Sequence, residues 1–339
     1  MKAVGLYQYL PIEDEQSLVD VEIDKPVATG KDVLVAVKSI AVNPVDTKVR
    51  APNDRVEKSP RILGWDAAGD VIAVGDQVEH YQVGDQVYYA GDITRQGSYS
   101  EYQLVDERII GHMPIGTDYA NAAAIPLTGI TAWEALFDRL GISSAGEDTG
   151  KTVLIIGGAG GVGSMAIQLA SKVAKLNVVA TASRDESRDW CLKLGASFII
   201  NHRHSLVKEL ALQDIQQVDY ILCLNNTDQY WEVMAEIIAP QGGICSIVET
   251  NAPVELNLLK SKAATFSWEF MFTRSMYQTP DMIEQKKLLN AIAELINQDQ
   301  LCTTVKEVLR PINAKNLRKA HAMIEQGSTI GKIVLTDWE

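Results

Sequence analysis

The sequence has little cysteine and no dense cluster of basic residues. Its four cysteines (Cys191, Cys223, Cys245 and Cys302) lie at least 22 residues apart and form no CxxC pair. This spacing predicts neither a disulfide framework nor a zinc ribbon. No run of five Lys or Arg residues occurs, and 31 Lys and Arg against 44 Asp and Glu give a net charge of −13. Nucleic acid and acidic membrane surfaces are therefore disfavoured as partners.

Long apolar runs are also missing. No apolar stretch approaches the roughly 20 residues that a membrane-spanning helix needs. The N-terminus carries one Lys followed by acidic residues and lacks the apolar segment of a signal peptide. Because the scattered thiols suit a reducing compartment, we expect a cytoplasmic protein that is neither exported nor anchored.

What the sequence does contain predicts two domains of different character, as a length of 339 residues favours. The first 110 residues hold short β-rich segments separated by Gly, Pro, Asn and Asp, a pattern typical of a β-barrel. From about residue 126 the pattern changes to alternating strands and helices, which predicts a doubly wound parallel sheet. The expected strands of the first part are 2–7, 17–23, 32–42, 66–74, 86–89 and 97–104.

The alternating part and the tail have the following expected elements. The helices are 130–140, 162–175, 186–194 and 228–238, and the strands are 152–156, 177–182, 198–200, 220–224 and 244–248. The tail is expected to contain a helix over 280–297, a strand over 305–309, a helix over 314–325 and a strand over 332–335.

A glycine-rich turn at 157–163 (GGAGGVG) follows an apolar strand and opens a helix. Gly158, Gly160 and Gly163 match G-x-G-x-x-G, in which the glycines allow a tight turn, close approach to a pyrophosphate and close helix packing. Gly161 and Val162 would start the helix, whose free N–H groups attract phosphates. The segment predicts a dinucleotide-binding site.

The end of the second strand of this part bears on the choice of cofactor. Ser183 and Arg184 stand where NAD-binding proteins place an acidic residue for the ribose 2′-hydroxyl. A hydroxyl and a guanidinium suit a 2′-phosphate, with Arg188 one helical turn further on. We therefore expect NADPH, although Asp185 could instead serve NAD and Arg184 could be a solvated surface charge.

Six segments taken together are specific to a family. They are residues 41–46 (AVNPVD), 74–87 (with Val74-Gly75 and Gly84-Asp85), 126–133 (PLTGITAW), 157–163, 200–203 (INHR) and 331–335 (GKIVL). In this order the chain resembles the medium-chain dehydrogenase/reductase superfamily. It is most similar to the zinc-free quinone oxidoreductase branch, which includes bacterial proteins labelled zinc-type alcohol dehydrogenase-like.

The resemblance implies a split domain. A GroES-like β-barrel catalytic domain would comprise 1–127 and 274–339, and a Rossmann domain would comprise 128–273, with nicotinamide and substrate in a cleft between them. The resemblance also implies a homodimer formed through the edge strand near 264–272, although an apolar strand of this kind could equally be internal core.

The resemblance raises the question of zinc. Zinc alcohol dehydrogenases of this superfamily use a Cys and then a Gly-His-Glu for the catalytic metal, and here these places hold Asn43 and Gly64-Trp65-Asp66. An indole cannot ligate zinc, and a neutral amide is a poor substitute for a thiolate. We expect no metal site.

Without a Lewis acid, the expected reaction is hydride transfer from NADPH to a quinone, in which charge delocalises onto oxygen. The alternatives are reduction of α,β-unsaturated carbonyls (enals or enones), or a cofactor-binding protein with little turnover.

The resemblance and the strand ends together supply the candidate site residues. The resemblance implies that Asn43 lies beside nicotinamide and substrate, that Thr128 contacts the carboxamide and that His202 lies at the adenosine end. Lys48 would orient or protonate the acceptor unless it is a solvated surface amine. Trp65 would line an aromatic pocket unless it is core. The remaining cofactor candidates follow strand ends or lie near the tail: Leu224, Asn225, Val248, Phe272 and Lys332.

Overall fold

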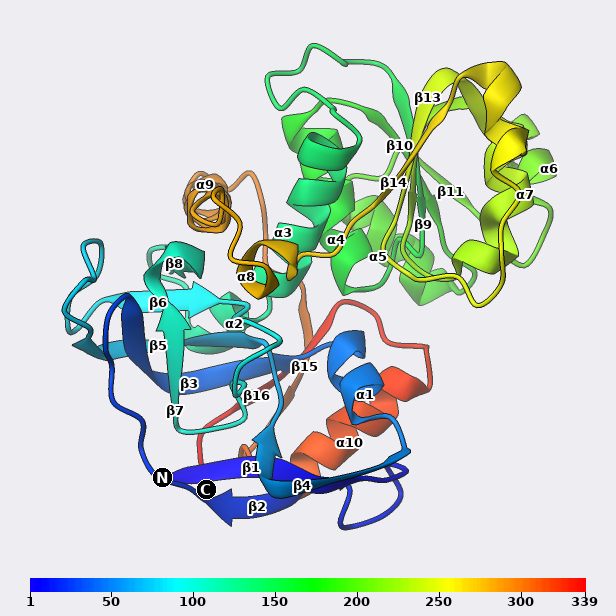
Figure 1. The fold of residues 1–339 in the computed structure, drawn as a ribbon. Helices are drawn as coiled ribbons and strands as arrows, with labels where there is room; N and C mark the ends of the chain where they lie inside the picture. Colours follow the sequence, from blue (N-terminus) through cyan, green and yellow to red (C-terminus); the bar gives the residue numbers. More distant parts are fainter. The chain divides into compact units, whose positions relative to one another are not determined.

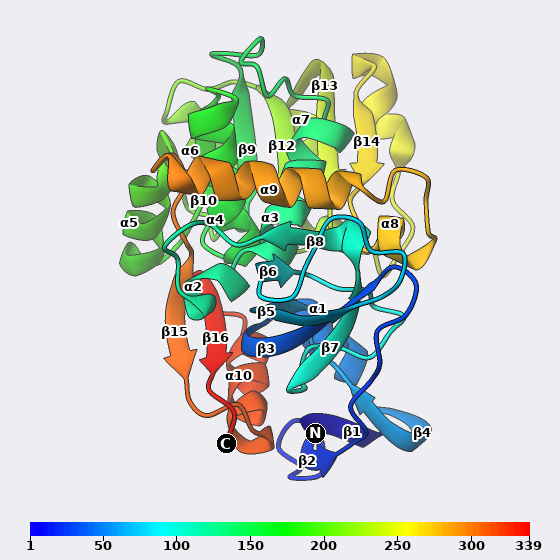
Figure 2. The same ribbon diagram turned by 90° about the vertical axis from the view of Figure 1, so that its left-hand side faces the viewer.

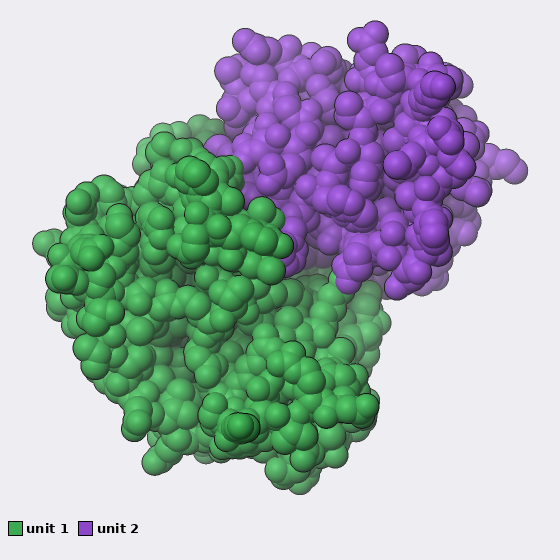
Figure 3. All heavy atoms as spheres, viewed as in Figure 1, with its two compact units in different colours: residues 1–127, 272–339 green, residues 128–271 purple.

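The chain divides into two compact units that are interleaved along the sequence. The computed structural model describes residues 1–339. Unit 1 comprises Met1–Leu127 and Phe272–Glu339, and unit 2 comprises Thr128–Met271 (Figure 3). One continuous segment of the chain therefore forms unit 2, and the segments before and after it together form unit 1. The sequence predicts the second boundary between the units at 273/274, two residues after the boundary that the structure shows.

Unit 1 is built on a seven-stranded sheet in the order β15-β16-β3-β5-β6-β8, with β7 paired to β3 as well. Strand β16, from the C-terminal segment, runs antiparallel to β3 with Ile333 opposite Val42. The two segments of unit 1 thus share one sheet (Figure 1). Its strands are β3 (Asp32–Val42), β5 (Asp66–Val74), β6 (Gln86–Tyr89), β7 (Tyr102–Asp106), β8 (Ile110–His112), β15 (Val305–Leu309) and β16 (Lys332–Thr336).

A smaller sheet in the order β2-β1-β4 and several helices complete unit 1. Helix α9 lies against β8 (Figure 2), and α10 lies beside α1 (Figure 1). Helix α9 buries one apolar face that includes Leu288, Leu289 and Ile292, which explains its position on the sheet. The elements are β1 (Lys2–Tyr9), β2 (Val19–Glu22), β4 (Asn53–Ile62), α1 (Pro44–Arg50), η1 (Glu107–Ile109), α2 (Tyr119–Ala123), α8 (Thr273–Met276), α9 (Glu284–Asn297) and α10 (Ala314–Glu325).

Unit 2 contains six parallel strands in the order β11-β10-β9-β12-β13-β14, with helices on both faces (Figure 1). This is the 3-2-1-4-5-6 order of a doubly wound sheet, so the predicted fold class is confirmed. The strands are β9 (Thr152–Ile156), β10 (Asn177–Thr181), β11 (Phe198–Ile200), β12 (Val218–Cys223), β13 (Ile238–Ser246) and β14 (Thr265–Trp268). The helices are α3 (Pro126–Trp133, beginning at the end of unit 1), η2 (Glu134–Arg139), α4 (Gly161–Gln168), η3 (Leu169–Val173), α5 (Asp185–Leu194), α6 (Leu206–Ala211), α7 (Thr227–Ile237) and η4 (Leu256–Lys262).

The sequence-based elements differ from the structure in several places, among them the helices α1 and α2 and the strand β8, which were not predicted. Strand β4 was not predicted, because its sequence NDRVEKSPRI is polar and most of its residues are exposed. The expected strand over 97–104 begins only at Tyr102, because Gly97, Ser98 and Tyr99 instead bond to the backbone of Ile62, Gly64 and Leu63. The expected helix over 130–140 starts earlier and continues as a π-helix from Glu134.

None of the helices has the length and apolar character needed to span a membrane.

Candidate active site

The glycine-rich turn between β9 and α4 has the geometry of a phosphate loop. Gly157 has a φ of +90°, which L side chains rarely adopt. A Cβ on Gly163 would lie 2.4 Å from the carbonyl oxygen of Gly157, and one on Gly158 would lie 2.8 Å from Cβ of Ala180. By contrast, a Cβ on Gly160 would meet nothing closer than 3.7 Å. Gly158 and Gly163 are thus required for packing, whereas Gly160 leaves open space at the loop.

The open space lies at the start of a helix. Gly160 is the N-cap of α4, and Gly161 and Val162 form its half-buried first turn. The first N–H groups of a helix have no partner within the helix and attract anions. The Gly157 N–H is held by Oγ1 of Thr181 at 2.9 Å, which ties the loop to β10. The loop therefore fits the pyrophosphate of a dinucleotide.

The residues after β10 and β11 lie at the same edge of the sheet, because Thr181 is in register with Ile200 in a parallel pair. Ser183 is half-buried and Arg184, the N-cap of α5, is exposed. Oγ of Ser187 donates to the carbonyl oxygen of Arg184 at 2.7 Å, which fixes this backbone at the end of β10.

The turn after β11 adds further basic groups at this edge. His202 is half-buried, and its burial, together with the neighbouring Arg203, lowers its pKa. Glu209 accepts hydrogen bonds from the Asn201 N–H and His204 Nδ1, both at 2.9 Å, and so fixes the turn. Arg203 is exposed, and sequence reasoning missed it, although a basic residue just after the third strand was a usable signal.

The ends of β12 and β13 bring further candidate residues to the phosphate loop or near it. Leu224 is half-buried and Asn225 exposed, and their Cβ atoms lie 3.5 and 3.8 Å from the Cβ position of Gly157. Val248 is half-buried, and its carbonyl oxygen accepts a hydrogen bond from the hydroxyl of Thr227. This edge lies at the carboxyl ends of the strands, where open α/β sheets bind ligands.

In unit 1, Asn43, Asp66 and Lys332 form one buried cluster. Nδ2 of Asn43 donates to Oδ2 of Asp66 at 2.8 Å, and Nζ of Lys332 donates to the same oxygen at 3.0 Å. Lys332 also donates to Oδ1 of Asn43 and to the carbonyl oxygen of Val42. The three side chains are at most 3% exposed. The structure thus places Lys332 in a buried cluster of unit 1, and its expected contact with the cofactor stays a prediction. The structure also adds Asp66 as the hydrogen-bond partner of both Asn43 and Lys332.

The other candidates of unit 1 lie in different surroundings. Trp65 is fully buried, its Nε1 donates to the carbonyl oxygen of Asp92 at 3.2 Å, and its ring meets Phe272 edge to face at 6.0 Å. The contacts of Trp65 therefore favour core packing over a place in an aromatic substrate pocket. Phe272 is likewise buried, and its expected place over the cofactor stays a prediction. Lys48 is exposed on the last turn of α1. In unit 2, Thr128 is buried in the first turns of α3.

A second buried network of unit 1 adjoins Asn43. The Asn43 N–H donates to Oδ2 of Asp46 at 2.8 Å, and the hydroxyl of Tyr99 donates to the same oxygen at 2.9 Å. Nδ1 of His321 accepts from Nε of Arg50 at 3.3 Å, so its Nε2 carries the hydrogen that faces the Tyr99 oxygen at 3.1 Å. Burial raises the pKa of Asp46 to about 7. Burial, and to a smaller extent the charge of Arg50, lower the pKa of His321 to about 3.

The residues at the zinc-ligand positions do not fit a zinc ion. Asn43 supplies an amide that is already bonded, Trp65 supplies an indole, and Asp66 is paired with an ammonium. No group of three or more His, Cys, Asp or Glu side chains in the chain could hold a metal ion.

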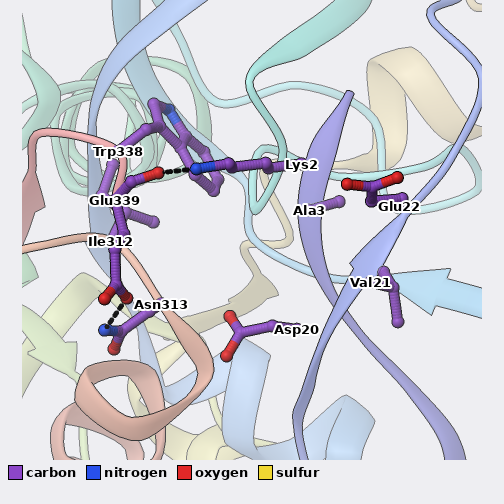
Figure 4. A pocket seen from close by; sticks show the side chains of 9 residues that line it. All are labelled: Lys2, Ala3, Asp20, Val21, Glu22, Ile312, Asn313, Trp338 and Glu339. Atoms are coloured by element: carbon purple, nitrogen blue, oxygen red, sulfur yellow. Dashed lines mark hydrogen bonds between the residues drawn. The ribbon is translucent and has the colours of Figure 1, made fainter.

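A surface pocket lies apart from these residues, at the two ends of the chain in unit 1 (Figure 4). Lys2, Asp20, Glu22 and Glu339 line it together with the ring of Trp338. Nζ of Lys2 donates to the backbone oxygen of Glu339, so the two ends of the chain are in contact at this pocket.

Comparisons with known proteins assign this architecture to a family. A family model described as an alcohol dehydrogenase GroES-like domain matches residues 29–121, and one described as a zinc-binding dehydrogenase matches 194–335. A zinc-type alcohol dehydrogenase-like protein of Staphylococcus aureus (strain Mu50) is 44% identical over 99% of both chains.

Solved structures agree with the sequence matches. A crystal structure from Rhizobium etli CFN 42, named as a candidate zinc-dependent alcohol dehydrogenase, is 45% identical with a TM-score of 0.95 and covers 100% of this chain and 98% of its own. The quinone oxidoreductase of Coxiella burnetii is 26% identical with a TM-score of 0.81 and 99% coverage of both chains. This chain therefore belongs to the medium-chain dehydrogenase/reductase superfamily of NAD(P)-dependent oxidoreductases.

Proposed function

We propose that this chain is an NADPH-dependent reductase that transfers a hydride to a quinone without a metal ion. The observation that carries the proposal is that one chain combines a complete phosphate loop with zinc-ligand positions held by Asn43 and Trp65. The similarity to the quinone oxidoreductase of Coxiella burnetii supports the choice of acceptor.

The preference for NADPH rests on the basic groups after β10 and β11. A 2′-phosphate has strong acceptor oxygens that a guanidinium binds in a bidentate manner. Ser183 and Arg184 follow β10, Arg203 follows β11, and the register of the two strands puts their ends at one edge. Asp185 lies in the first turn of α5 and is exposed. The helix N-terminus at Gly160 would hold the pyrophosphate.

The chemistry that this site favours needs no Lewis acid. When bound, NADPH supplies the hydride, and a conjugated acceptor spreads the developing charge onto its oxygen. The chain's contribution is to bind and orient the cofactor through the loop at 157–163 and the residues after β10 to β13. Reduction of α,β-unsaturated carbonyls has the same requirement and is the second candidate activity.

The test is a screen of purified, metal-analysed protein. We expect oxidation of NADPH with 1,4-naphthoquinone to exceed that with 2-hexenal, and NADPH to be preferred to NADH. Faster turnover of the enal would favour the second activity. Cofactor binding detected by NADPH fluorescence, with no oxidation by either acceptor class, would contradict both and indicate a binding protein with little turnover.

We also propose that the chain forms a homodimer through the segment 264–272. Strand β14 is an edge strand with only β13 as a neighbour, and an edge strand offers unpaired backbone groups. Trp268 and Phe270 are 46% and 45% exposed, which is unusual for large apolar side chains. Sedimentation velocity should give a dimer for the wild-type protein and a monomer for Trp268→Glu. A wild-type monomer would contradict the proposal.

A further inference from the structure

The phosphate loop of unit 2 is held at both of its ends by hydroxyl groups. At the first end, Oγ1 of Thr181 accepts the Gly157 N–H at 2.9 Å. At the second end, the hydroxyl of Ser164 donates to the carbonyl oxygen of Gly160 at 2.7 Å, and the Ser164 N–H donates to the same oxygen at 2.8 Å. Gly160 is the N-cap of α4, so this second pair of hydrogen bonds fixes the point at which the helix begins.

A tryptophan from the next helix completes the second contact. Nε1 of Trp190, on α5, donates to Oγ of Ser164 at 2.8 Å. Ser164 is fully buried and Trp190 is half-buried. The neighbouring Cys191 packs on the loop as well, since its Sγ lies 3.3 Å from the Cβ position of Gly158. Helix α5 therefore contacts the loop and the start of α4 through two consecutive residues.

The indole of Trp190 determines what the Ser164 hydroxyl can do. A hydroxyl rotates, and a serine inside a helix can bond to the carbonyl four residues earlier or point elsewhere. Because Oγ accepts the Trp190 N–H, its own hydrogen is left to donate, and the carbonyl oxygen of Gly160 is closer to it than that of Ala159, at 2.7 against 3.5 Å. Trp190, Ser164 and Gly160 thus form one chain of hydrogen bonds, in which neighbouring bonds polarise one another.

This chain of hydrogen bonds ends at the peptide that faces the cofactor site. The peptide bond between Gly160 and Gly161 is trans, so the carbonyl of Gly160 and the N–H of Gly161 point in opposite directions. Fixing the carbonyl therefore also fixes the first N–H group of α4. Such an N–H group has no partner within the helix and attracts a phosphate.

We propose that Trp190 is a positioning residue for the cofactor: its indole N–H holds the Ser164 hydroxyl on the carbonyl oxygen of Gly160 and so orients the Gly161 N–H toward the pyrophosphate. The same helix α5 carries Arg184 at its N-cap, so Trp190 also ties the helix of the expected 2′-phosphate site to the phosphate loop. This inference rests on the proposed function only in that the loop binds a dinucleotide, and it does not depend on the acceptor.

Removal of either hydrogen bond in the full chain tests the proposal. Trp190→Phe keeps an aromatic ring but removes the donor, and Ser164→Ala removes the hydroxyl. Each should raise the Kd for NADPH roughly 3- to 10-fold, as the loss of one hydrogen bond implies. The Kd for NADH should rise by the same factor, because both cofactors contain the pyrophosphate. The double variant should lie within about twofold of the weaker single variant, because both residues act through one carbonyl.

The matched control is Trp231→Phe in the same unit. Trp231 lies on α7, and its Nε1 donates to the carbonyl oxygen of Glu255 at 3.1 Å. This variant loses the same kind of hydrogen bond and should lower Tm, but it should keep both Kd values within about twofold of wild type. Titration followed by the emission of the cofactor gives the Kd values without depending on the tryptophan that is replaced.

Trp190→Phe and Ser164→Ala proteins that have a lowered Tm but bind both cofactors like wild type would overturn the proposal and leave these residues a role in stability alone. A loss of affinity confined to NADPH would also overturn it, because such a loss arises at the 2′-phosphate. If Ser164→Ala does not fold, Trp190→Phe decides alone. A wild-type chain that binds neither cofactor would overturn the proposed function and this inference with it.

Discussion

The hydroxyl of Tyr99 donates to Oδ2 of Asp46 across 2.9 Å, and both side chains are fully buried in unit 1. The Asn43 N–H bonds to the same carboxylate oxygen, while Oδ1 of Asp46 has no hydrogen-bond partner. A buried carboxylate with one unpaired oxygen is costly to ionise. The core of unit 1 therefore holds a group that titrates near neutral pH.

Asp46 should make the protein less stable as the pH rises. Its pKa is about 7 in the folded chain, raised by burial, against 3.8 in the unfolded chain. The stabilising contribution of the protonated form is complete below 3.8 and is lost as the pH rises through 7. The loss is at most about 4 kcal/mol. Asp46→Asn cannot ionise and should show a flatter dependence of unfolding free energy on pH between 5 and 8.

Urea denaturation of the full chain at several pH values, followed by tryptophan fluorescence, measures this dependence. Asp54→Asn, on the exposed face of β4, is the matched control and should keep the wild-type slope. An Asp46→Asn protein with the wild-type slope would contradict the prediction.

His321 should act in the opposite direction at lower pH. Burial, and then Arg50, lower its folded pKa to about 3 against 6.5 in the unfolded chain. Its stabilising contribution is complete above 6.5 and is lost as the pH falls toward 3. His321→Gln should be less stable than wild type at neutral pH but should lose less stability between pH 6.5 and 4. The exposed His80→Gln serves as control, and equal acid slopes for both variants would count against the prediction.

Arg184 should determine the discrimination between the two nicotinamide cofactors. If its guanidinium binds the 2′-phosphate, Arg184→Ala should raise the Kd for NADPH roughly 10- to 100-fold, as the loss of hydrogen bonds to a charged group implies. The Kd for NADH should change less than about twofold, because NADH lacks this phosphate. Fluorescence titration with both cofactors measures the effect, with the exposed Lys208→Ala as control. An equal loss for NADH would argue against the assignment.

Gly160 and Gly163 should respond differently to alanine. A Cβ at position 163 would lie 2.4 Å from the oxygen of Gly157, so Gly163→Ala should lower Tm and weaken NADPH binding together. A Cβ at position 160 has room in the protein and would crowd only the pyrophosphate. Gly160→Ala should therefore keep Tm within about 2 °C while raising the Kd for NADPH at least about 10-fold. Unchanged NADPH binding by Gly160→Ala would place the pyrophosphate elsewhere.

Local signals in the sequence were sufficient for much of the fold. The strands Asp32–Val42, Thr152–Ile156 and Val305–Leu309 were predicted with the bounds that the structure shows. The first two are rich in apolar residues, which is the signal of a buried strand. Strand β4 was missed because its polar residues give no such pattern and its pairing with β1 is a long-range contact. Edge strands of this kind take their structure from a partner rather than from their own residues.

The sequence by itself determined the phosphate loop, because the glycine spacing, the preceding strand and the following helix are contiguous in the chain. It also indicated that Asn43 and Trp65 are unsuited to zinc, since an indole cannot ligate the metal and an amide is a poor substitute for a thiolate. Only the tertiary structure decided that Trp65 is core and that Lys332 pairs with Asp66 beside Asn43. These contacts join residues from different strands and from both segments of unit 1. Only the register of the folded sheet brings them together.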